Sequence, residues 1–190
     1  MAHLNTYSAE DQARMLRVAR KAILHGLAER DVIKLTLSHY PGHLRENGAS
    51  FVTLTTGGRL RGCIGALRAY QPLIQDVAEH AFAAAFKDAR FSPLQEEELS
   101  KINIHISILN PAEKMQVTSE QDLLTQLRPG VDGLIIKDGA LQATFLPSVW
   151  KQLSDPAEFL LHLKHKAGMG SDHWSGSMEC YRYTVTEFGE

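Results

Sequence analysis

The segment Leu60-Arg61-Gly62-Cys63-Ile64-Gly65-Ala66-Leu67 decides the fold of the region around it. It follows Phe51-Val52-Thr53-Leu54-Thr55-Thr56, and only Gly57-Gly58 separate the two runs. Two β-rich runs joined by two glycines predict a hairpin, because both glycines accept the positive φ that tight turns need. We therefore predict an antiparallel hairpin that pairs residues 51–56 with residues 59–66.

The two-residue turn also predicts the register of this hairpin. Because strand side chains alternate, Arg61, Cys63 and Gly65 are expected on one face of the second strand. The other face is expected to carry Leu60, Gly62, Ile64 and Ala66. The predicted cross-strand pairs are Thr56 with Arg59, Leu54 with Arg61, and Val52 with Cys63.

Cys63 is the candidate nucleophile of the chain. The thiolate is the reactive form of cysteine, and a neighbouring cation such as Arg61 favours it. Gly62 and Gly65 cost strand stability and are typical of places where a backbone or a ligand approaches closely. We therefore assign Cys63 and Arg61 to a candidate catalytic site and both glycines to ligand binding. The alternative is a buried cysteine that packs as a small hydrophobe against the first strand.

Composition indicates one ordinary globular domain. The chain has 190 residues, of which 44% are apolar and 22% charged, which is typical of soluble proteins. The net charge of −2 argues against a nucleic-acid binder. No apolar run approaches the ~20 residues of a membrane span, and Met1 to Tyr7 shows no signal-peptide pattern. Two distant cysteines favour a reducing compartment, so we expect a cytoplasmic protein.

The remaining elements fall into blocks of helices and hairpins. A Ser8 cap with Asp11 three residues later opens a helix, and the Asp138-Gly139 turn predicts a second hairpin. Blocks of this kind predict an α+β fold with a mostly antiparallel sheet and packed helices, with room for a large and a small subdomain. The predicted helices are 8–26, 72–87, 120–127, 147–153 and 155–168, and the further strands are 101–109, 134–137, 140–145 and 180–188.

Two details of these elements bear on function. In helix 72–87 the apolar stripe is expected to face the sheet, which turns Asp76, His80 and Lys87 towards solvent. In strand 101–109 the isoleucines alternate with polar residues, so His105 lies on the polar face. A nucleophilic cysteine needs a base, commonly a histidine, and His105 is the best candidate. Whether it meets Cys63 depends on a strand order that the sequence does not give.

Several motifs together resemble the AMMECR domain family, whose microbial members are called AmmeMemoRadiSam system protein A. The hexapeptide Leu60–Gly65 is its most recognisable feature, and the resemblance covers roughly Ser8 to Phe188 as a single domain. One departure is Ala66, where the family usually has threonine. The further matching stretches, in family order, are Asp88-Ala89-Arg90-Phe91-Ser92-Pro93, Ile104–Leu109, Phe145-Leu146-Pro147 and Lys166-Ala167-Gly168.

The resemblance implies partners and further site residues. The family name reflects co-occurrence with a Memo-type protein and a radical-SAM protein, which implies a shared pathway. Asp88 and Arg90 would rim a pocket over the hairpin, although a purely local ion pair explains them equally well. Lys166 would bind an anionic ligand beside Trp174, or would simply complement a helix C-terminus.

No cofactor is expected from the motifs. The chain has no H-E-x-x-H, P-loop, paired-cysteine or G-x-G-x-x-G pattern. It also lacks the C-x₃-C-x₂-C cluster, so it is not the radical-SAM member. Two hypotheses remain: an enzyme with a Cys63 and Arg61 cleft, or a non-catalytic binding or adaptor module for a protein partner or small ligand.

Overall fold

A computed structural model describes residues 7–190, so of the Met1 to Tyr7 stretch only Tyr7 is described. The chain divides into two compact units, which are treated separately. The first unit comprises the chain up to Leu109 together with Thr186–Glu190, and the second comprises Asn110–Val185.

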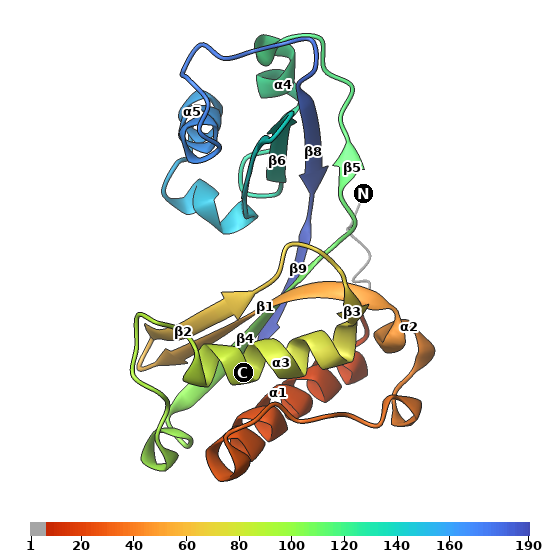
Figure 1. Cartoon of the computed structure of the whole chain (residues 1–190), viewed down its shortest axis with the longest axis vertical. Coiled ribbons are helices and arrows are strands. Elements are labelled where there is room, and N and C mark those ends of the chain that lie inside the picture. Colours follow the sequence, from red (N-terminus) through yellow and green to blue (C-terminus); the bar gives the residue numbers. More distant parts are fainter. Residues whose placement is uncertain (1–6) are drawn as a thin grey trace. The chain divides into compact units, whose positions relative to one another are not determined.

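The first unit is a sheet with helices on one face. Its sheet has the strand order β2-β1-β4-β9, and β3 pairs with β1 beside this path. Helices α1 and α3 lie against each other on the same face of this sheet (Figure 1). The elements are α1 (Ala9–Glu29), α2 (Gly42–Arg45), β1 (Asn47–Thr56), β2 (Arg59–Gly65), β3 (Gln71–Pro72), α3 (Leu73–Phe86), β4 (Ile102–Leu109) and β9 (Val185–Gly189), with short 3-10 helices η1 (Leu37–His39) and η2 (Glu96–Glu98).

Two predicted elements of this unit are confirmed with their physical basis. Helix α1 begins after Ser8, whose side chain accepts from the Asp11 N–H while the Asp11 carboxylate accepts from Ser8 N, which is a complete capping box. Strand β4 buries all four isoleucines of its alternating pattern. His105 lies on the opposite, half-buried face, as the alternation predicts.

The hairpin of β1 and β2 is confirmed, but its predicted register is wrong beyond the turn. Thr56 does pair with Arg59, yet Leu54 pairs with Gly62 rather than with Arg61. The shift occurs between Leu54 and Thr55, where β2 carries one extra residue and forms a β-bulge. Cys63 therefore lies opposite Thr53 and not opposite Val52. A one-residue slip exchanges the faces of a strand, so the neighbour of the thiol is a hydroxyl instead of an apolar side chain.

The two glycines of β2 allow other parts of the protein to pack closely against the strand, and neither borders an open space. A Cβ at Gly62 would lie 2.0 Å from the carbonyl oxygen of Ala84, in the backbone of α3. A Cβ at Gly65 would lie 2.3 Å from the ring of Phe51 and 2.5 Å from the Ser50 carbonyl. The close approach expected at Gly65 is therefore made by the Phe51 ring of the protein itself, which occupies the space beside this glycine.

Helix α3 covers the hairpin as predicted, but its polar side is partly buried. Asp76 is completely buried, and His80 is only 6% exposed. The expectation that both face solvent is wrong, because the N–H and hydroxyl of Ser50 in β1 donate to Asp76 under the helix, and His80 Nδ1 lies 3.1 Å from the same carboxylate oxygen. Buried polar groups are tolerated when they satisfy one another.

The second unit is a smaller sheet with its own core. The strand order is β5-β8-β6-β7, and the Asp138-Gly139 turn joins β6 to β7 as predicted. Its core gathers side chains from α5, β6 and the 3-10 helix η3, including the stacked rings of Trp150 and Phe159. The elements are β5 (Glu113–Lys114), α4 (Glu120–Gln126), β6 (Gly133–Asp138), β7 (Leu141–Phe145), η3 (Pro147–Lys151), α5 (Pro156–Lys166) and β8 (Glu179–Tyr183).

One predicted strand is in fact two. The stretch 180–188 was expected to form a single final strand, but it divides at Thr184 into β8 and β9. The two strands belong to different sheets. Cys180 of β8 belongs to the core of the second unit, whereas Phe188 of β9 belongs to the core of the first, so each segment follows its own core.

The α+β class is confirmed, with antiparallel pairing of β1 to β2, β3 and β4 and of β6 to β7 and β8. In the described part of the chain, helices are too short or too polar to cross a bilayer.

The tight contact at Gly62 gives a test of the fold. Gly62→Ala should lower the free energy of unfolding by about 1–3 kcal/mol or more, because a helix backbone must move to admit the methyl group. Denaturant unfolding of the purified variant measures the change. Gly42→Ala is the matched control, since its Cβ meets only the tip of Arg45 at 3.7 Å. Equal stability of both variants would contradict the close approach of α3 to β2.

Candidate functional site

The candidate site is the face of the first sheet that α1 and α3 leave uncovered. Cys63 and His105 are the register partners of Thr53 on its two sides, so the three residues form a row across β2, β1 and β4. The Thr53 hydroxyl donates a hydrogen bond to the Cys63 sulfur at 3.2 Å. The thiol is only partly buried. The hydroxyl is therefore a polar neighbour of the thiol on the adjacent strand.

The main chain of Cys63 is held on both sides by one ion pair. Strand β2 is at the sheet edge, where its outward N–H and C=O groups have no neighbouring strand. Asp88 accepts the Cys63 N–H at 2.9 Å, and Arg90 donates to the Cys63 carbonyl at 3.4 Å. The two side chains also bond each other through both carboxylate oxygens. The predicted pair thus exists, and it fixes the backbone that carries the thiol.

This clamp depends on the charge of Asp88. Asp88 is 5% exposed, and hydrogen bonds from the Arg90 guanidinium hold the pKa of its carboxyl group well below the ordinary range. Burial opposes that effect, and the bond from the Cys63 N–H adds to it. Arg90 responds in the opposite sense, with its pKa raised first by the bonds to Asp88 and in smaller part by Cys63.

Arg61 has other partners than the sequence predicts. Its guanidinium donates to both carboxylate oxygens of Glu98, at 2.7 and 2.9 Å, and to the Ser92 carbonyl at 3.0 Å. This bidentate pair raises the pKa of Arg61 and lowers that of Glu98. The bulge places Arg61 against the loop after α3. Arg90, not Arg61, is the arginine bonded to the Cys63 main chain.

His105 shares the face of Cys63 but not its immediate neighbourhood. Two inter-strand steps of about 4.8 Å separate their backbones, or roughly 10 Å. Direct hydrogen bonding across that distance needs a bridging group, and Thr53 lies between them. Gly189 of β9 borders the other side of His105, where a Cβ would lie 2.8 Å from Nδ1.

Comparison with known proteins identifies the family of the chain. A family model described as AMMECR1 matches residues 16–188, which span both units. The chain belongs to the AMMECR1 family. The resemblance carried by the hexapeptide of β2 and the later motifs is therefore confirmed.

Relatives and a solved structure extend the AMMECR1 match to most of the chain. A protein from Methanothermobacter thermautotrophicus is 35% identical over 185 residues, covering 96% of each chain. Protein MJ0810 from Methanocaldococcus jannaschii is 37% identical over 179 residues, covering 92% of this chain and 88% of its own. The crystal structure of uncharacterized protein PH0010 from Pyrococcus horikoshii matches with a TM-score of 0.80 at 31% identity, covering 93% and 90% of the two chains.

Lys166 belongs to the second unit and has structural partners there. Its ammonium group donates to the Thr144 carbonyl at 3.0 Å and lies 5.2 Å from the centre of the Phe145 ring. It is also the last residue of α5, where a cation complements the helix dipole. Trp174 packs against the core of the same unit. These contacts match the helix-end alternative, and binding of an anionic ligand by Lys166 stays a prediction.

The second cysteine of this AMMECR1-family chain is a core residue. Cys180 is 1% exposed, and burial raises the pKa of its thiol to about 11. The described residues contain no group of three histidine, cysteine or acidic side chains arranged to hold a metal ion.

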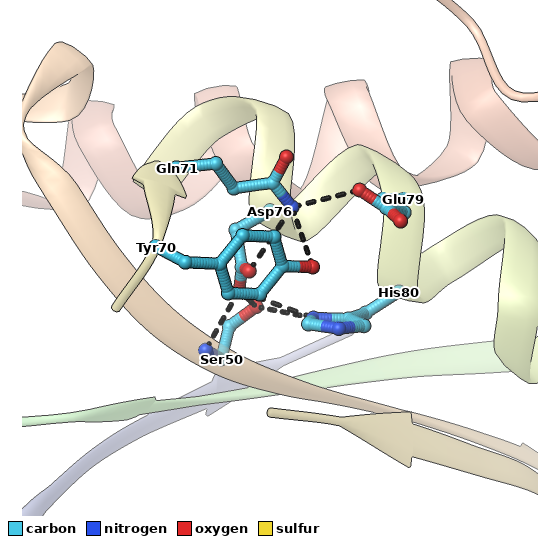
Figure 2. Close-up of polar contacts among 6 residues, drawn as sticks. All are labelled: Ser50, Tyr70, Gln71, Asp76, Glu79 and His80. Carbon is cyan, nitrogen blue, oxygen red and sulfur yellow. Dashed lines mark hydrogen bonds and ion pairs between the residues drawn. The ribbon is translucent and has the colours of Figure 1, made fainter. Parts of the chain in front are cut away.

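Sequence reasoning missed two sets of partners. Thr53 was not singled out because the bulge that places it beside Cys63 leaves no mark on the residue pattern. The buried trio of Ser50, Asp76 and His80 (Figure 2) was missed as well. The four-residue spacing of Asp76 and His80 puts them on one helix face, and that spacing was the available signal.

The clamp on Cys63 predicts a pH dependence of stability. The folded-state pKa of Asp88 is depressed, so its contribution is present above the unfolded pKa of about 4 and is lost as the pH falls below it. Asp88→Asn should lower the Tm at pH 7 and flatten the decline of Tm between pH 5 and pH 3. Thermal unfolding of both proteins across this range measures the effect. Parallel Tm profiles would contradict the role of the Asp88 charge.

Proposed function

We propose that this AMMECR1-family protein is a thiol-dependent enzyme and that Cys63 is its reactive group. The observation that carries the proposal is the partly exposed Cys63 sulfur, hydrogen-bonded by Thr53 on a main chain held by Asp88 and Arg90. Reactive cysteines lie in electropositive, partly exposed surroundings, whereas structural ones are buried. Arg90 supplies the positive charge, and its side chain is 56% exposed.

The proposal assigns separate roles to the residues around the thiol. Thr53 donates to sulfur, and Arg90 attracts an anionic group of a substrate that approaches Cys63. Asp88, Arg61 and Glu98 are positioning residues, because they hold β2 and the loop after α3 rather than the sulfur. His105 is the candidate base, reached through a water or substrate group beside Thr53.

We further propose that the enzyme works in a pathway with a Memo-type and a radical-SAM protein. The support is the family membership, since the family name reflects co-occurrence of the three proteins in microbes. The proposed compartment is the cytoplasm, where free thiols such as Cys63 and Cys180 stay reduced.

A second candidate function is a non-catalytic binding or adaptor module. It is favoured by one observation: among residues 7–190, the hydrogen-bond partner of the Cys63 sulfur is a threonine and not a basic side chain. In this alternative the uncovered face of the sheet binds a partner segment or a small ligand, and the thiol takes no part in chemistry.

Thiol labelling tests whether Cys63 has the reactivity that the enzyme proposal needs. Native protein treated with iodoacetamide should label at Cys63 well before Cys180, because Cys180 is buried and its pKa is raised to about 11. Peptide mass spectrometry separates the two sites. Thr53→Val removes the hydroxyl donor at nearly constant shape and should slow the Cys63 reaction. Labelling of Cys63 only after denaturation would exclude the catalytic role.

Partner binding separates the two functions. Cys63→Ser should abolish pathway activity in cells and still co-purify with the Memo-type or radical-SAM partner if the thiol is catalytic. Phe51→Ala alters the same face without touching sulfur and serves as the control for surface binding. Full pathway activity of a folded Cys63→Ser protein would instead favour the adaptor.

A further inference from the structure

A positively charged pocket lies between α1 and the 3-10 helix η1 of the first unit. Its volume is about 300 Å³, which is at the small end of the range of about 300–1,000 Å³ for ligand sites. Among the described residues, its lining contains cationic, aromatic and apolar side chains and no carboxylate. The lining residues are Arg14, Arg17, Val18, Lys21, His39 and Tyr40.

Both walls of the pocket belong to well-anchored elements. Val18 of the 21-residue helix α1 and Tyr40 of the loop pack into the core of the first unit. The Tyr40 N–H donates to the Leu37 carbonyl at 3.0 Å, which closes the turn of η1. Farther along this loop, His43 Nε2 lies 3.1 Å from the Asp11 carboxylate in the first turn of α1. These contacts tie the loop to the helix, so the pocket is a built feature of the unit.

The cations of the pocket project from one face of α1. Arg14, Arg17 and Lys21 are spaced by three and four residues, which places them on successive helical turns. Arg14 forms an ion pair with Glu10 at 2.7 Å. Within residues 7–190, the side chains of Arg17 and Lys21 have neither an ion-pair nor a hydrogen-bond partner. Repulsion between like charges four residues apart destabilises a helix, so this arrangement costs stability and calls for a counter-charge.

The local excess of positive charge does not reflect a basic chain. The protein has 20 lysines and arginines against 22 acidic residues. A surface that served only solubility would intersperse the two signs. In the pocket, three cations stand against the single carboxylate of Glu10, which leaves two positive charges without a partner. A cleft lined by one sign of charge concentrates ions of the opposite sign.

We propose that this pocket binds the phosphate group of a small phosphorylated molecule. A phosphate monoester carries about −1.5 to −2 charges at neutral pH, which matches the two uncompensated positive charges. Arg17 is at the centre of the three cations, and its planar guanidinium suits bidentate pairing with phosphate oxygens. Arg14 and Lys21 add donors from the neighbouring turns, and Tyr40 forms the wall beside the rest of the molecule. This site does not rest on the proposed role of Cys63.

Ligand titration tests the chemical class. Inorganic phosphate and ribose 5-phosphate are the probes, and acetate at the same ionic strength is the anionic control. Because a ligand of the native state raises the Tm, both phosphates should give a saturable increase that acetate does not. Backbone amide NMR should place the largest shifts in residues 14–21 and 39–40. Equal Tm increases with acetate would indicate an adventitious ion only and would overturn the proposal, as would shifts spread over the whole surface.

A charge reversal separates binding from stability. Arg17→Glu places a carboxylate one turn before Lys21, a favourable helix pair, so the Tm without ligand should be retained or raised. Phosphate binding should nevertheless weaken about tenfold or more, the effect of losing a charge-assisted hydrogen bond. Arg59→Glu is the matched control, since it makes the same charge change at an exposed position of β2 outside the pocket. Equal phosphate affinity of the two variants would overturn the site.

Two further measurements distinguish this site from the alternatives. A short single-stranded DNA should bind no more tightly than ribose 5-phosphate. Tighter binding of the DNA that is also lost in Arg17→Glu would overturn the small-molecule assignment in favour of a nucleic acid. Cys63→Ser should bind phosphate as the native protein does, so failure of the thiol proposal and failure of the phosphate site are separate outcomes.

Discussion

The first unit depends on one missing side chain, the Cβ of Gly62. A Cβ at residue 62 would lie 2.0 Å from the Ala84 carbonyl oxygen of α3. The helix therefore lies closer to β2 than any residue with a side chain at this position would allow. The small residues Ala78, Ala81, Ala84 and Ala85 continue this contact along the helix and are all buried. The approach fixes the height and the direction of α3 over the sheet, and with it the positions of the polar groups that the helix and the loop after it bring to β1 and β2.

Both ends of α3 deliver polar groups to β1 and β2. At its C-terminal end the chain turns so that Asp88 meets the exposed N–H of Cys63 on the edge strand. At its N-terminal half Asp76 and His80 lie over Ser50. An edge strand normally leaves such groups to water, and burying a carboxylate is costly unless it is paired and hydrogen-bonded. Here the Asp88 carboxylate accepts from the unpaired N–H of Cys63, and the buried Asp76 carboxylate accepts from Ser50. These bonds explain why charged residues are tolerated against an alanine-rich core.

The sequence was informative where local chemistry decides the structure. The Gly57-Gly58 and Asp138-Gly139 turns, the Ser8 capping box and the isoleucine alternation of β4 each have a local cause, and each prediction is confirmed. The bulge at Arg61 has no such local cause, and it makes Thr53, rather than Val52, the cross-strand partner of Cys63. Helix periodicity predicts that His80 faces solvent because it assigns polar residues to the exposed side of the helix. Its burial instead depends on polar partners that include Ser50 of a distant strand. The division of 180–188 into two strands likewise reflects two cores that the pattern alone does not separate.

The alternation of β1 separates the candidate site at Thr53 from the buried polar cluster at Ser50, three residues away. Ser50 turns to the helices and Thr53 to the uncovered face, so one strand donates to the Asp76 carboxylate on one side and to the Cys63 sulfur on the other. The same strand pairs with β2 and β4, which makes it the most constrained element of the unit. A displacement of β1 by one residue would exchange the faces and destroy both arrangements together. The register that the bulge establishes therefore fixes the polar contacts on both faces of β1, those of Thr53 with Cys63 and of Ser50 with Asp76.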